Sequence, residues 1–158
     1  MKNLKSKLTI AIIIILIASV TSVVYSHCQI PCGIYDDPAR LNAIAEHITT
    51  IEKSMKQITQ LSKEKPENMN KIVRWVQNKE DHAAKLSEIV TYYFMTQRIK
   101  PVGDRESKEY QQYTQKLTLL HKMLFYNMKA KQSTDLSHVE KLRSLLAEFK
   151  TVYLGQAS

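Results

Sequence analysis

Residues 37–62 read DPARLNAIAEHITTIEKSMKQITQLS, and this stretch decides the fold. Its apolar side chains recur at spacings of three and four residues, which places them in one stripe along one face of a helix. Asp37 and Pro38 are typical of a helix start, with an acid at the N-cap and proline at the first helical position. The sequence therefore predicts an amphipathic helix over residues 38–62, with its stripe formed by Leu41, Ile44, Ile48, Ile51, Met55, Ile58 and Leu61.

Three further stripes follow, separated by short polar breaks. The chain has only three glycines and four prolines, and no segment alternates with the period of a strand. Four amphipathic helices with short links pack economically as an up-down-up-down bundle. We therefore predict an all-α fold, a four-helix bundle over residues 38–158, with Gly155 ending the last helix. The later stripes are Ile72, Trp75, Val76, Ala83, Leu86, Ile89, Val90 and Tyr93, then Tyr110, Tyr113, Leu117, Leu120, Leu124 and Met128, then Leu136, Val139, Leu142, Leu146, Phe149 and Tyr153.

The segment before the first helix, residues 27–37, reads HCQIPCGIYDD and contains both cysteines of the chain. We call it the hook. If the chain is cut before His27, the new terminus offers an amine, an imidazole, the Cys28 amide nitrogen and the thiolates of Cys28 and Cys32. The amine, the amide and the two thiolates can form a planar set, which favours nickel(II) or copper(II) over zinc. Gly33 permits a tight turn after the second thiol.

Residues 1–26 have the pattern of a secretory signal peptide. Lys2, Lys5 and Lys7 precede an apolar run, and Val24 and Ser26 are small residues before the expected cut. The alternative is an uncleaved membrane anchor, because residues 8–25 approach the length of a span. Cleavage predicts an exported protein, whether periplasmic, luminal or secreted, that meets the membrane only through this segment during export.

The composition narrows the possible partners. The formal net charge is +8, yet the lysines are scattered among acids, with no basic stripe and no recognition motif. We expect no nucleic-acid partner, and instead a positive field that favours small anions. No Ser-His-Asp order, phosphate-binding glycine loop or pair of catalytic carboxylates is identifiable.

From spacing alone, the two cysteines of an exported protein are more often a disulfide than a metal site. The leading histidine changes this balance, because the hook resembles the start of the mature nickel superoxide dismutases, His-Cys-x-x-Pro-Cys-Gly-x-Tyr. The matching residues are His27, Cys28, Pro31, Cys32, Gly33 and Tyr35. Residues 74–83 and 92–94 look like the second helix of that family, which is a four-helix bundle of this length.

The resemblance implies an enzyme that converts superoxide to dioxygen and hydrogen peroxide with one nickel ion per subunit, cycling between Ni(III) and Ni(II). His27, Cys28 and Cys32 would be the metal ligands. Tyr35 would stand over the open face of the metal, and Tyr93 would be the second tyrosine. The family forms homohexamers, so a homohexamer is expected here.

One feature of the site and two other functions remain open. The residue that holds the His27 imidazole is not fixed, with Asn42, Glu46 and His82 as candidates, while His47, His121 and His138 are predicted to be ordinary surface or boundary residues. The alternatives are a non-catalytic secreted nickel- or copper-binding protein and a helical interaction protein closed by a Cys28–Cys32 disulfide.

Overall fold

A computed structural model of the chain describes residues 32–63 and 68–155. The chain divides into two compact units, residues 1–32 and residues 33–158. Cys32 is the only described residue of the first unit, so the predicted signal peptide lies outside the described residues. The described helices, which lie between residues 37 and 154, all belong to the second unit.

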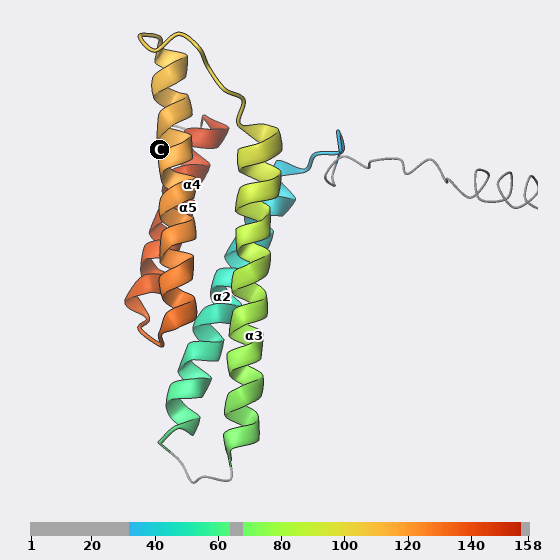
Figure 1. Cartoon of the computed structure of the whole chain (residues 1–158), viewed down its shortest axis with the longest axis vertical. Coiled ribbons are helices and arrows are strands. Elements are labelled where there is room, and N and C mark those ends of the chain that lie inside the picture. The colour runs from blue at the N-terminus through green and yellow to red at the C-terminus, as the bar shows by residue number, and fades with distance from the viewer. Residues whose placement is uncertain (1–31, 64–67, 156–158) are drawn as a thin grey trace, which may run out of the picture. The chain divides into compact units, whose positions relative to one another are not determined.

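The second unit is an antiparallel helical bundle, as predicted (Figure 1). Its segments are α2 (Asp37–Leu61), α3 (Met69–Glu88), η2 (Ile89–Arg98), α4 (Lys108–Gln132) and α5 (Ser137–Leu154). Contacts join each helix to the next one in the chain, and α2 to α5, so the four rods close into a ring around one core. No described residue belongs to a strand. None of the described helices combines the length and apolar character that a membrane span requires.

Local chemistry explains where the helices begin and end. Asp36 is the N-cap of α2, because its carboxylate accepts a hydrogen bond of 2.9 Å from the backbone N–H of Ala39. The predicted cap, Asp37, is instead the first helical residue, and its carboxylate is used elsewhere. Gly155 ends α5 as predicted, with a φ of 67° in the left-handed region that favours glycine.

The core confirms the stripe of α2 but corrects that of α4. In α2, Leu41, Ile44 and Ile48 are almost completely buried. In α4 the predicted Met128 is 41% exposed. Leu120 of the predicted stripe is buried, and Tyr113, Leu117 and Leu124 pack partly buried against the core. The buried positions that the predicted stripe did not contain are Leu119, Met123, Asn127 and Ala130.

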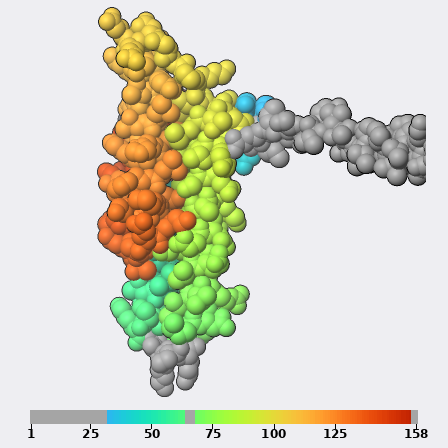
Figure 2. Space-filling model, viewed as in Figure 1, coloured from blue at the N-terminus to red at the C-terminus, as the bar shows by residue number. Residues whose placement is uncertain are grey.

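Two buried polar side chains connect α3 to α4. The ammonium group of Lys79 donates to the carbonyl oxygens of Lys131 and Ser133, at the end of α4. Asn127 donates through Nδ2 to the carbonyl oxygen of Ala83 at 2.7 Å. Figure 2 shows side chains of α4 lying against those of α3 and η2 on the viewed face. These bonds fix the register of the two helices, because each pairs a side chain with one particular carbonyl group.

The predicted second helix does reach Arg98, but its last ten residues are a π-helix, η2. The wider turn is evident in bonds between residues five apart. The backbone N–H of Ile99 donates to Phe94 at 2.9 Å, and the Thr96 hydroxyl donates to the Thr91 carbonyl at 2.8 Å. A π-helix is rare and occurs often at functional sites. Here it carries Tyr93 and Arg98.

Candidate metal centre and tyrosine cluster

The structure describes only one of the three predicted metal ligands. His27 and Cys28 lie outside the described residues, whereas Cys32 is described and exposed. Gly33 follows it with a φ of 78°, a left-handed conformation that side-chain-bearing residues rarely adopt. The tight turn predicted at Gly33 is therefore confirmed.

The two predicted tyrosines lie together in the helical unit. The rings of Tyr35 and Tyr93 meet edge to face, with centroids 5.9 Å apart. Tyr35 is 41% exposed, whereas Tyr93 is only 3% exposed. The guanidinium carbon of Arg98 stands 4.4 Å from the centroid of the Tyr35 ring. Tyr35 is therefore supported by the buried Tyr93 and by a cation, and it still reaches solvent.

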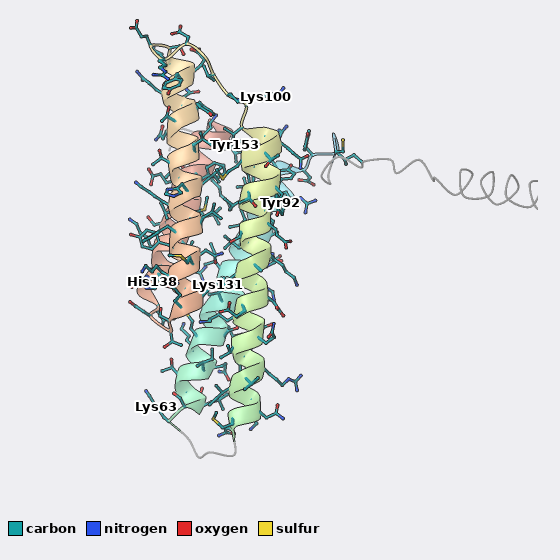
Figure 3. All side chains as sticks on the ribbon, viewed as in Figure 1. Lys63, Tyr92, Lys100, Lys131, His138 and Tyr153 are labelled. Carbon is teal, nitrogen blue, oxygen red and sulfur yellow. The ribbon has the colours of Figure 1, made fainter. Side chains whose placement is uncertain are left out.

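A single carboxylate organises these residues. Asp37 Oδ1 accepts hydrogen bonds from the Tyr93 hydroxyl at 2.6 Å and from Arg98 Nε at 2.8 Å. Asp37 Oδ2 accepts from Arg98 Nη2 at 2.7 Å and from the Tyr153 hydroxyl at 2.9 Å. We call Tyr35, Asp37, Tyr93, Arg98 and Tyr153 the Asp37 cluster. It joins the first residue of α2 to the last residue of η2 and to the end of α5, where Figure 3 labels Tyr153.

The protonation states in the cluster follow from these bonds. Burial alone would raise the pKa of Asp37, but hydrogen bonds from Arg98, Tyr93 and Tyr153, with the charge of Arg98, hold it below its usual value. Burial and the bond to Asp37 raise the pKa of Tyr93 to about 12. The same causes raise the pKa of Tyr153 to about 12. Near neutral pH, Asp37 is therefore a carboxylate and both tyrosines are protonated donors.

Sequence reasoning missed Asp37, Arg98 and Tyr153 as members of this site. Asp37 was interpreted as a helix cap, and Tyr153 as part of an apolar stripe. Arg98 lay at the end of a predicted α-helix, in which residues 93 and 98 are about 1.4 turns apart and point in different directions. The one available signal was that each of the three carries a polar or ionisable group at a predicted helix end or within a predicted apolar stripe.

The candidates for holding the His27 imidazole lie further along the bundle. Asn42 and Glu46 are exposed on α2. His82 on α3 contacts His47 on α2, with their Nδ1 atoms 3.0 Å apart. His47 is therefore paired with another histidine, which its interpretation as an ordinary boundary residue did not anticipate. The position of His27 lies outside the described residues, so this prediction stays a prediction.

The donor atoms of the hook suit a nickel ion, and the described residues offer no other set of three donors. Among residues 32–63 and 68–155, no group of three or more His, Cys, Asp or Glu side chains is placed to hold a metal ion. The hook combines nitrogen donors with thiolates, and thiolates are electron-rich ligands that stabilise a high oxidation state. The exposed Cys32 thiol and the Gly33 turn are compatible with that use.

Comparison with known proteins identifies the class. The family model described as nickel-containing superoxide dismutase matches residues 22–156, which include the whole hook and nearly all of the bundle. The chain belongs to this family. No curated protein and no solved structure matches it in the corresponding searches.

Family membership establishes the activity and the cofactor. The protein is an oxidoreductase that dismutates superoxide, and its cofactor is nickel. The function predicted from the hook is therefore confirmed at the level of the family.

Proposed function

We propose that the chain performs nickel-dependent superoxide dismutation at the hook, with His27, Cys28 and Cys32 holding the metal. The observation that carries the proposal is the family match, which extends through all of these residues. The bound nickel would supply one-electron oxidation and reduction, so that two superoxide ions and two protons become dioxygen and hydrogen peroxide. Cleavage before His27 would supply the free amine that completes the donor set.

The two tyrosines would have different roles. The Tyr93 hydroxyl group already donates a hydrogen bond to Asp37, and its side chain is almost completely buried. Tyr93 would therefore act as a positioning residue for the ring of Tyr35. Tyr35 keeps 41% of its surface exposed and would order substrate or solvent through its hydroxyl group. Arg98 would also hold the Tyr35 ring, by a cation–π contact.

The field around the cluster would be balanced rather than strongly positive. Asp36 and Asp37 offset the charges of Arg40 and Arg98. The guanidinium carbon of Arg40 lies 5.4 Å from the centroid of the Tyr93 ring. Attraction of the superoxide anion would therefore come from the net positive charge of the mature chain, which falls from +8 to +5 when the leader with Lys2, Lys5 and Lys7 is removed. Such steering weakens as salt is added, because exposed charges are screened.

Export and assembly complete the proposal. The leader of residues 1–26 would direct the chain out of the cytoplasm, and its removal would expose His27 in the same event. A homohexamer would bury apolar side chains that the described helices leave at the surface, and such patches mark interaction sites. Examples are Val73 at 61%, Tyr92 at 51% and Phe125 at 46% exposure.

One preparation from the native host tests the proposal by intact mass, nickel content, sedimentation and superoxide turnover. We expect a chain beginning at His27, about one nickel ion per subunit, a hexamer, and loss of metal and turnover in Cys28→Ser. His121→Gln is the control, because its side chain is exposed on α4. A metal-free chain with a Cys28–Cys32 disulfide would refute the ligand assignment. Copper bound without turnover would favour a metal carrier.

A further inference from the structure

The contact between His47 and His82 was not predicted, although His82 alone was a candidate for holding the His27 imidazole. The two rings come from neighbouring antiparallel helices, with their centroids 5.0 Å apart and their planes at 70°. Their Nδ1 atoms face each other at 3.0 Å, so one Nδ1–H donates to the other ring nitrogen. Both side chains are half-buried, which leaves room for solvent at the contact.

The separation of the two nitrogens matches what a metal ion requires. Imidazole nitrogens bind first-row metals at about 2.0–2.1 Å, so two of them on one ion lie about 2.9 Å apart at a right angle and about 3.4 Å apart at a tetrahedral angle. The observed 3.0 Å falls in this range. Each ring would have to turn, because the two Nδ1 atoms now face each other and their lone pairs must instead meet at a point to one side of the line that joins them.

The backbone holds both histidines in place without a metal. Ile48, next to His47, and Ala83, next to His82, are completely buried between the packed helices. The two rings therefore keep their spacing because the α2–α3 contact keeps it. A preformed pair of ligands lowers the entropic cost of binding, since little has to be ordered when the ion arrives.

The charges around the pair would permit a cation but not attract it strongly. Lys85 and Glu46 are close enough to act on His47 with opposite signs. Burial, followed by the nearby His82 and Lys85, lowers the pKa of His47, so its ring is neutral at neutral pH and can act as a ligand. The donating ring would move its proton from Nδ1 to Nε2 through solvent, which frees the Nδ1 lone pair for the ion.

We propose that His47 and His82 form a second metal site, distinct from the hook, that binds one divalent transition-metal ion through their two Nδ1 atoms. Water completes the coordination shell, since the two imidazoles are the only His, Cys, Asp or Glu ligands that the described residues bring to this point. Copper(II) binds most tightly in the series that includes nickel and zinc. The ion bridges α2 to α3.

The experiment uses the full chain with the hook donors removed by His27→Ala, Cys28→Ser and Cys32→Ser. Copper(II) is titrated into this background, into the same background with His47→Gln and His82→Gln, and into a matched control with His121→Gln and His138→Gln. Affinity is read by competition with a chromophoric chelator. The ligands are read by the nitrogen hyperfine pattern in electron paramagnetic resonance.

We expect the first double variant to lose at least about tenfold in affinity, along with the signature of two imidazoles. The matched control should keep both. Equal affinity and an unchanged spectrum in the His47→Gln and His82→Gln protein would overturn the proposal. If that variant fails to fold, nuclear magnetic resonance of the background protein decides: copper(II) must broaden the ring signals of His47 and His82 before those of the other histidines. Because the hook is disabled throughout, the result is independent of superoxide turnover.

Discussion

Replacing Asp37 by asparagine should destabilise the bundle substantially, because one carboxylate holds three separate segments together. The side chain is 17% exposed and that of Arg98 is 29% exposed, so the pair is partly buried. Removing one partner of a fully buried pair costs about 3–5 kcal/mol, and hydrogen bonds to charged groups contribute about 1.5–3 kcal/mol each. Allowing for the remaining exposure, we expect a loss of about 2–3 kcal/mol.

Urea unfolding followed by circular dichroism measures this loss. All variants must be compared at one subunit concentration, since oligomerisation shifts apparent stability. Asp36→Asn is the matched control: it removes the same charge one residue away, but asparagine caps a helix as well as aspartate does. Its stability should stay within about 0.5 kcal/mol of the parent.

The pH dependence of the free energy of unfolding tests the same reasoning in a second way. The pKa of Asp37 is lowered in the folded state, so its contribution is fully present above its ordinary value of 3.8 and is lost as the pH falls through the lower folded value. The difference between the parent and Asp37→Asn should therefore be constant near neutral pH and shrink in acid. A difference below about 0.5 kcal/mol at neutral pH, or one that grows in acid, would refute the account.

Three further predictions concern alkaline stability, the end of α4 and the metal. The raised pKa of Tyr153, about 12, predicts that its contribution to the free energy of unfolding is fully present below pH 10 and is lost as the pH rises through 12. In urea titrations at alkaline pH, Tyr153→Phe should therefore show a smaller decline in stability than the parent. Lys79→Met should cost about 1–3 kcal/mol in urea unfolding, because two carbonyl groups of the chain lose their donor, and a loss under about 0.5 kcal/mol would contradict that role. Cys32→Ser should abolish nickel binding and turnover while leaving the helical circular dichroism spectrum unchanged, since Cys32 lies outside the helical unit; retained nickel would show that this thiol is not a ligand.

The sequence was sufficient for the fold because the apolar periodicity of α2 and α5 is simple. Their buried residues fall on the predicted stripes except for Ser54 and Leu145, and Gly155 ends the last helix where expected. The prediction was poorer for α4, where Met128 proved exposed and Asn127 buried. Periodicity counts apolar residues, so it could not recognise a buried asparagine that pairs with a carbonyl group of α3.

The candidate site could be predicted only where local sequence determines it. The hook is a continuous motif, and the turn at Gly33 follows from one residue type. The pairing of His47 with His82 joins residues 35 positions apart, and the bond from Tyr153 to Asp37 joins residues 116 positions apart. Such contacts depend on how helices pack and rotate, which a single sequence read for periodicity does not specify.

The π-helix η2 explains both why the Asp37 cluster exists and why it was missed. Five residues complete about one turn of a π-helix but about 1.4 turns of an α-helix. Tyr93 and Arg98, five residues apart, therefore point the same way in η2, and both reach Asp37. In a regular α-helix they would diverge, and one of them would lose the carboxylate. The wider turn thus brings a buried phenol and a cation into contact with the same tyrosine, Tyr35, two residues before the bundle begins.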